Sequence, residues 1–244
     1  MKAFMDLIFT TDFFYSIFRV TTPLLFASMG AVISDVAGVP NIALEGMMLI
    51  AAFAGMFFSY FFESALMGLL FALLFAVLCA GVLAFFTLYY KTNIILGGIA
   101  INSLASGGTI FFLYLAAHDK GTSVSLPSKV LPNVNIPLIQ DIPVIGPAIS
   151  GHNVLTYLAI VAVIFTFFLL KRTSLGWHLR AVGEKKEAAD SVGISVAKTQ
   201  AIALILSGLM CGFGGAFMSM GYVSWFSRDM VSGRGWIALA AEAM

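Results

Sequence analysis

Long apolar segments dominate this chain and restrict what it can fold into. Hydrophobic residues make up 60% of the chain and charged residues only 10%, whereas a soluble domain carries roughly 25% charged residues. A helix needs roughly 20 apolar residues to cross the hydrocarbon core of a bilayer. Six segments have about that length, and they cover residues 13–36, 41–62, 65–89, 92–117, 153–170 and 199–222.

The sequence therefore predicts an all-α fold, a polytopic transmembrane helix bundle with six full transmembrane helices in one domain over residues 1–244. A seventh apolar segment begins near Gly235 and is cut off at Met244, so we expect it to be too short to span. The basic stripes with interleaved aromatic residues that are typical of nucleic-acid binding do not occur in the sequence. Cys79 and Cys211 lie within apolar segments, which favours buried thiols over a disulfide or a metal site.

Charge is concentrated in residues 171–198, between two apolar segments. This stretch holds six of the thirteen Lys and Arg residues, with three acidic residues interleaved. Because positively charged loops stay in the cytoplasm, we expect a cytoplasmic loop here, and alternation then places residues 118–152 and the N-terminus outside. Five of the seven prolines fall in residues 118–152, which favours irregular or briefly helical structure there. Lys2 and Arg19 weakly oppose an outside N-terminus, and a broken or re-entrant first or second segment would resolve that conflict.

A short helix is predicted inside the charged stretch. Residues 184–192 are good helix formers with a polar majority, and Gly193 suits the left-handed conformation that ends a helix. Ser195 is then a candidate N-cap for the next apolar segment. Such a helix, anchored at both ends, can be moved as one body by a docking partner. The alternative is a solvated loop whose charges serve topology alone.

Small residues recur at helical spacing in the last long apolar segment. Ser207, Cys211 and Gly215 are four residues apart, and Gly208 and Gly212 form a neighbouring ridge. In lipid, small residues let helix backbones approach closely, so we expect this helix in the centre of the bundle. Plain packing explains the pattern, and the alternative is that the helix also lines a path or a subunit interface.

Polar residues also fall within the predicted spans. Asn41 and Glu45 are four residues apart, which places them on one face if this segment is helical. A carboxylate near membrane depth faces a cavity or a partner, so Asn41 and Glu45 are candidate residues of a translocation path. Glu45 would organise a gate or a contact between helices, with Arg19 as a candidate partner. The alternative is that Glu45 lies fully wet at the cytoplasmic interface.

A second polar stripe lies in the fourth apolar segment. Asn102, Ser106 and Thr109 fall on one face of a helix. This stripe is the best candidate for the wall of a hydrophilic path, although hydrogen bonds between helices explain the same pattern.

Several stretches resemble one family of transport proteins. The charged stretch carries the motif residues Arg180, Gly183, Glu184, Glu187, Ala188, Ala189 and Gly193. With four other stretches, it is similar to ABC-importer permeases of the branched-chain amino acid, ribose and nucleoside superfamily, closest to bacterial nucleoside or simple-sugar permeases. Pro40 departs from the family pattern. Members of the family continue past the Gly-Arg-Gly motif at residues 233–235, so the resemblance implies that this chain is truncated at its C-terminus. The four other stretches are residues 37–49, 141–146, 207–216 and 233–241.

The resemblance implies a type II ABC importer in a bacterial inner membrane. A second permease subunit, identical or different, would complete the path for a nucleoside or simple sugar. A separate ABC ATPase subunit would dock on the charged loop, and an extracytoplasmic solute-binding protein or lipoprotein would deliver the solute. The sequence has no G-x-x-x-x-G-K-[ST] phosphate loop. ATP and Mg would therefore be bound by the ATPase, and we expect no cofactor and no enzyme activity in this chain.

A stand-alone secondary transporter or channel for a small polar solute is the alternative function. Ion-coupled transporters carry ionisable residues near the bilayer midplane. The third to sixth apolar segments show no midplane carboxylate, which favours the importer permease.

Overall fold

The computed structural model describes residues 10–119, 121–135 and 150–244. Six of its helices are long and apolar enough to cross a membrane, so the predicted all-α polytopic bundle is confirmed. The spans are α2 (Thr11–Val36), α3 (Leu44–Phe61), α4 (Ala65–Ala84) with the π-helical η1 (Phe85–Tyr89), α5 (Ile94–Ala117), α8 (Val154–Arg172) and α11 (Val196–Phe217) with the π-helical η2 (Met218–Tyr222). The shorter helices are α9 (Ser174–Glu184), α10 (Lys186–Ser191) and α12 (Arg234–Glu242).

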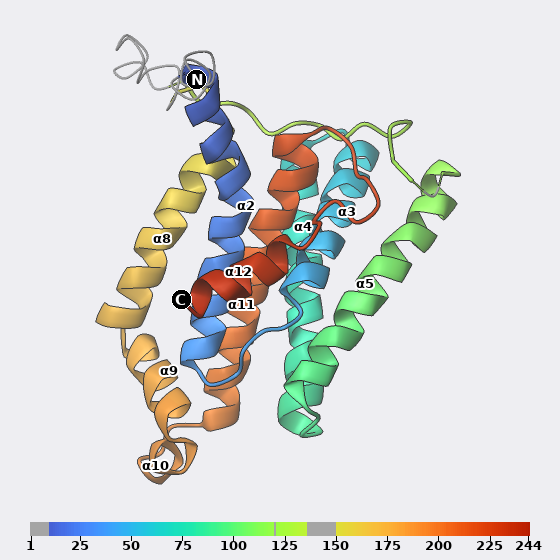
Figure 1. Ribbon diagram of the computed structural model, residues 1–244. Coiled ribbons are helices and arrows are strands. Elements are labelled where there is room, and N and C mark those ends of the chain that lie inside the picture. Colours follow the sequence, from blue (N-terminus) through green and yellow to red (C-terminus); the bar gives the residue numbers. More distant parts are fainter. Residues whose placement is uncertain (1–9, 120, 136–149) are drawn as a thin grey trace, which may run out of the picture.

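The spans run between two ends of the bundle (Figure 1). One end carries α9 and α10, and we call it the charged end. The opposite end carries the start of α2 and the segment that follows α5, and we call it the N-terminal end. The N-terminal region and the segment after α5 thus lie opposite residues 171–198, as the predicted alternation requires.

Polar side chains fix the starts of three spans. Ser64, Asn93 and Asn153 each accept a hydrogen bond from a backbone N–H in the first turn of α4, α5 and α8, respectively. The first N–H groups of a helix have no partner within it, and lipid offers none. These caps therefore set where the helices begin, within two residues of the positions that hydropathy predicts.

The helix α11 lies at the centre of the bundle, in contact with α2, α3 and α4. A Cβ added to Gly208 would overlap the methyl group of Ala80 and come within 3.0 Å of the Ala76 carbonyl oxygen. A Cβ on Gly212 would lie 3.1 Å from that of Ala76, and one on Gly215 would overlap the Met48 carbonyl. The small-residue ridges therefore let the backbones of α3 and α4 pack directly against α11.

Two segments at the N-terminal end pair through their backbones. The Ser123 N–H donates to the Phe226 carbonyl at 2.8 Å, and the Ser128 N–H donates to the Ser224 carbonyl at 2.7 Å. Residues 123–128 are therefore held against the chain that follows η2, and they include a turn in which the Leu126 N–H donates to the Ser123 carbonyl at 2.8 Å. Residues 141–146, which carry part of the family resemblance, lie outside the described residues.

The connection from α2 to α3 differs from the sequence prediction. The second span was expected to begin at Asn41, but α3 begins at Leu44 because residues 37–43 form a non-helical linker, with a left-handed Gly38 (φ +68°). In Figure 1 this linker rises from the end of α2 toward the middle of the bundle. The short α12 crosses the bundle near the same height, packed on α2 and α3.

The packing around α11 predicts opposite effects for two glycine substitutions. In Gly208→Ala the added methyl group meets Ala80, so we expect the protein to lose about 1–3 kcal/mol of stability, as overpacked cores do. In Gly107→Ala the methyl group meets nothing within 4 Å, and the higher helix propensity of Ala should leave stability unchanged or raised. Thermal unfolding of both variants in one detergent measures the difference. Equal melting temperatures would contradict the central position of α11.

Candidate functional site

The charged end carries a helical hairpin, α9 and α10, which we call the coupling hairpin (residues 174–191). The predicted single helix over 184–192 is wrong in its first part. Glu184 is the last residue of α9, and Lys185 is extended (φ −153°, ψ +102°) before α10 begins. The Lys185 N–H still donates to the Ala181 carbonyl at 3.1 Å. The final turn of α9 is therefore complete when the chain changes direction.

The end of α10 follows the prediction more closely. Gly193 adopts a left-handed conformation (φ +84°), its N–H donates to the Asp190 carbonyl, and the Ile194 N–H donates to that of Ala189. These bonds satisfy carbonyls that a helix end leaves free. Ser195 occupies the N-cap position of α11, but its side chain forms no capping hydrogen bond, so that part of the prediction is wrong.

Close backbone contacts join the coupling hairpin to the spans. A Cβ added to Gly183 would overlap the Val36 carbonyl, and a Cβ added to Gly38 would lie 3.2 Å from the Gly183 Cα. The Gln200 side chain of α11 donates to the Ala37 carbonyl at 3.1 Å. A displacement of the hairpin would therefore reach the end of α2 and the start of α11 together.

The predicted coupling residues divide into an exposed and a buried group. Ala189 is buried, and it fixes α10 against the protein. Glu184, Glu187 and Ala188 are exposed. Arg180 is half-buried beside a cavity of about 560 Å³ that Val36, Gly183 and Glu184 also line. The hairpin thus presents charged side chains outward on a body that is held by its apolar face.

Polar side chains that are buried or half-buried gather where the linker meets α3, and we call this group the polar cluster (Asn41, Glu45, Asn102 and Ser207). The Asn41 amide donates to the Ser207 hydroxyl at 2.9 Å and accepts from the Ala43 N–H at 3.0 Å. Asn41 is fully buried and lies in the linker, not in α3. It therefore does not share a helical face with Glu45 as the spacing suggested, because the chain is not helical between the two residues.

Asn102 connects α5 to the same region. Its carbonyl oxygen accepts from the Gly46 N–H at 2.8 Å, and its amide donates to the Ile42 carbonyl at 2.9 Å. One side chain thus satisfies two backbone groups around the start of α3, where lipid could satisfy neither.

Glu45 holds the start of α12. Its two carboxylate oxygens accept from the N–H groups of Gly233 and Gly235, each at 2.7 Å. A carboxylate is favoured there because the N-terminus of a helix carries partial positive charge. The expected pairing with Arg19 does not form, since the Arg19 guanidinium instead donates to the Tyr222 carbonyl and lies 4.2 Å from the centre of the Tyr222 ring. Glu45 is half-buried, so a fully wet position is also wrong.

The other members of the polar stripe on α5 make separate contacts. The Ser106 hydroxyl donates to the Asp229 carboxylate at 3.0 Å, and the Thr109 hydroxyl donates to the Ala105 carbonyl of its own helix at 2.7 Å. Neither Asp229 nor Gln200 was predicted from the sequence to take part in this site. The signal for Gln200 is a polar side chain near the start of an apolar span, and Asp229 lies in a loop that carries no comparable signal.

This architecture, six apolar spans with a charged hairpin at one end and a polar cluster inside, defines a polytopic helical membrane protein. Residues 13–242 match the family described as the branched-chain amino acid transport system permease component. The chain belongs to that family. It is a multi-pass permease of the ABC transporter type in the inner membrane, and thus a transport subunit.

Three curated relatives illustrate the match. The guanosine ABC transporter permease NupQ of Bacillus subtilis is 34% identical over 90% of this chain and 70% of its own length. The nucleoside permease NupC of Lactococcus lactis is 33% identical over 91% of this chain and 71% of its own length. The putative glucose permease TsgC13 of Haloferax volcanii is 33% identical over 91% of this chain and 67% of its own length. No solved structure matches the chain.

The contacts of Glu45 predict how α12 responds to a substitution. Glu45→Gln leaves one acceptor oxygen for two N–H groups, and hydrogen bonds to charged groups are each worth about 1.5–3 kcal/mol. We therefore expect the Gly233 and Gly235 amides to exchange hydrogen roughly 10-fold faster or more, on the basis of that energy. Hydrogen exchange with mass spectrometry measures this. Glu63→Gln, at an exposed turn, is the control, and unchanged exchange in both variants would mean that Glu45 does not hold α12.

Proposed function

We propose that this permease forms the translocation path for a nucleoside, in an importer completed by a second permease subunit. The identity to a guanosine permease over 90% of the chain carries this proposal. The described polar cluster supports it, because amides and hydroxyls suit the hydroxyls and ring nitrogens of a nucleoside. A simple sugar is the second candidate substrate, favoured by the similarity to a permease named for glucose.

The path runs beside the linker, along the stripe of Asn102, Ser106 and Thr109 on α5. Non-helical backbone at membrane depth is tolerated only where it is buried in protein or lines a water-filled cavity, and the linker is such a segment. Asn41 and Glu45 position the linker and α12, while Ser106 is half-buried and its hydroxyl faces Asp229 of the segment before α12. A change in the linker would therefore alter the wall that the solute meets.

The energy for transport comes from a separate ATPase subunit. The sequence has no phosphate loop, so ATP and Mg bind to the ATPase and this chain needs no cofactor of its own. The ATPase docks on the exposed residues of the coupling hairpin, which faces the cytoplasm as the loop 171–198. A solute-binding protein or lipoprotein delivers the solute at the N-terminal end.

ATP-driven motion of the ATPase moves the coupling hairpin as one body. The contacts of Gly183 with Val36 and of Gln200 with Ala37 carry that motion to α2 and α11. Both helices also contact the polar cluster, α2 through Ser34, which accepts from the Asn41 N–H at 3.2 Å, and α11 through Ser207. The hairpin thereby biases the permease between inward-facing and outward-facing states.

Two substitutions in the hairpin test the coupling. Gly193→Val forces a β-branched residue into a left-handed conformation, a strain of about 1–3 kcal/mol, and Glu184→Arg reverses an exposed charge. With the assembled importer in liposomes, we expect uptake to fall at least about 10-fold, which corresponds to a loss of about 1.4 kcal/mol of coupling free energy, while ATP hydrolysis continues.

Glu63→Arg reverses a charge at the opposite end and should leave both activities unchanged. If both hairpin variants assemble and transport normally, the hairpin is not the coupling element.

A competition assay tests the substrate and the path. Cells that express the complete importer should take up labelled guanosine, and unlabelled nucleosides should compete more strongly than glucose. Preferential competition by glucose would instead assign the sugar. In the same assay we expect Ser106→Ala to raise the KM for uptake several-fold, because the hydroxyl faces the proposed path.

Ser103→Ala is the matched control, since Ser103 is exposed on the same helix and its hydroxyl bonds only to the Ile99 carbonyl among the described residues. Equal kinetics for the two variants at equal protein levels would remove Ser106 from the path.

A further inference from the structure

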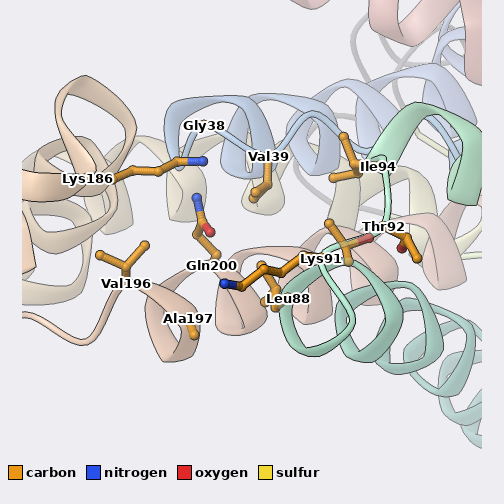
Figure 2. Close-up of a pocket in the computed structure, with 11 residues that line it drawn as sticks. Gly38, Val39, Leu88, Lys91, Thr92, Ile94, Lys186, Val196, Ala197 and Gln200 are labelled. Carbon is orange, nitrogen blue, oxygen red and sulfur yellow. The ribbon is translucent and has the colours of Figure 1, made fainter.

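A second cavity, of about 430 Å³, opens at the charged end. The linker, the turn between η1 and α5, and the starts of α10 and α11 surround it, as Figure 2 shows. None of the described lining residues is acidic. The lining residues are Gly38, Val39, Thr87, Leu88, Lys91, Thr92, Ile94, Lys186, Val196, Ala197 and Gln200.

Two lysine side chains enter this cavity from opposite walls. Lys91 extends from the turn after η1 and Lys186 from the first residue of α10, and Figure 2 shows both side chains pointing inward. Neither ammonium group belongs to a salt bridge in the described part of the chain, where the pair between Arg228 and Asp229 is the one found. Two positive charges therefore share a cavity without a negative partner.

Neutral donors face the same space. Val196 and Ala197 form the first turn of α11, and Ser195 leaves that turn without a side-chain cap. The N–H groups of an uncapped helix start attract anions. The cavity thus offers two cations and an uncapped helix start.

We propose that this cavity binds a phosphoryl group, supplied by the headgroup of an anionic phospholipid. Phosphate oxygens accept hydrogen bonds from ammonium, N–H and hydroxyl groups together. Basic pockets between membrane-spanning helices bind anionic headgroups in the same way. The site is independent of the transported solute.

The surroundings of the cavity favour a lipid over a soluble phosphate. The cavity lies beside η1, which ends the α4 span, and beside the first turns of α5 and α11, so the headgroups of a surrounding bilayer would lie next to it. Next to its lining residues, Tyr89 and Tyr90 are 72% and 60% exposed, and Leu96 is 67% exposed. Tyrosine is enriched at the membrane interface, and the apolar surface of α5 offers a place for acyl chains beside the cavity.

The bound headgroup would join the coupling hairpin to the turn between η1 and α5. Lys186 belongs to the coupling hairpin, Lys91 belongs to the turn between η1 and α5, and Gln200 lines the cavity while it holds the Ala37 carbonyl. An anion between the two lysines therefore ties the hairpin to α4 and α5, and it should raise the thermal stability of the permease.

Lipid binding to the purified full chain tests the proposal. Phosphatidylglycerol or phosphatidylcholine is titrated into the protein in detergent, and native mass spectrometry counts the lipid adducts. We expect phosphatidylglycerol, but not phosphatidylcholine, to bind and raise the melting temperature. The double variant Lys91→Gln with Lys186→Gln should lower phosphatidylglycerol adducts about five-fold or more, which corresponds to roughly 1 kcal/mol.

Two matched double variants serve as controls, one for the loss of positive charge and one for misfolding. Lys171→Gln with Lys185→Gln removes the same charge from residues that do not line the cavity, and it should bind lipid like the parent. Lys91→Arg with Lys186→Arg keeps the charge and should retain binding, which separates a lost site from a misfolded protein. Equal adduct loss in both glutamine variants would overturn the proposal.

Two further outcomes would assign the cavity to another ligand. In the first, inorganic phosphate raises the melting temperature of the parent as much as phosphatidylglycerol does, and fails to raise that of the double variant Lys91→Gln with Lys186→Gln. The occupant would then be a soluble phosphate and not a lipid. If the lysines prove necessary for co-purification of the ATPase and irrelevant to phosphatidylglycerol binding, the cavity receives acidic side chains of that protein and the lipid site is overturned.

Discussion

Backbone contact around α11 is the constraint on which the other features of this permease depend. Lipid tails are as apolar as the side chains of a span, so helices in a membrane associate through close packing and hydrogen bonds. Gly208, Gly212 and Gly215 bring α3 and α4 against α11, and Gly30 brings α2 against it at Ser207. Only because these backbones are so close can the Ser207 hydroxyl reach Asn41 in the linker. The polar cluster is thus a product of the small-residue packing.

Among the described residues, two members of the polar cluster bond to backbone groups and not to other side chains. Asn102 bonds to two backbone groups around the start of α3, and Glu45 bonds to two N–H groups at the start of α12. Because lipid offers no partner to replace a lost one, each side chain is tied to one arrangement of the linker. A permease that changes between two states must therefore move these groups together.

The spans could be predicted from sequence, and the interruptions could not. Hydropathy depends on residues that lie within one segment, so it located all six spans. Asn41 and Glu45 were assigned to one face because their spacing fits a helix, but spacing does not reveal that the backbone between them is not helical. Glu45 was paired with Arg19 because a carboxylate suggests a cation. Its partners are backbone N–H groups, which leave no side-chain signal in a sequence. Lys185 is a good helix former, and its extended conformation coincides with the docking of Gly183 on Val36.

The hold of Glu45 on α12 has a consequence for the biogenesis of the protein. The carboxylate and the Gly233 N–H that it binds are 188 residues apart in the chain. The ribosome synthesises α3 long before α12, so the carboxylate that binds the start of α12 is already in the membrane when α12 emerges. Until then Glu45 is a carboxylate at membrane depth without its final partners. Assembly of this permease therefore includes an interval in which Glu45 must be shielded by water or by a temporary neighbour.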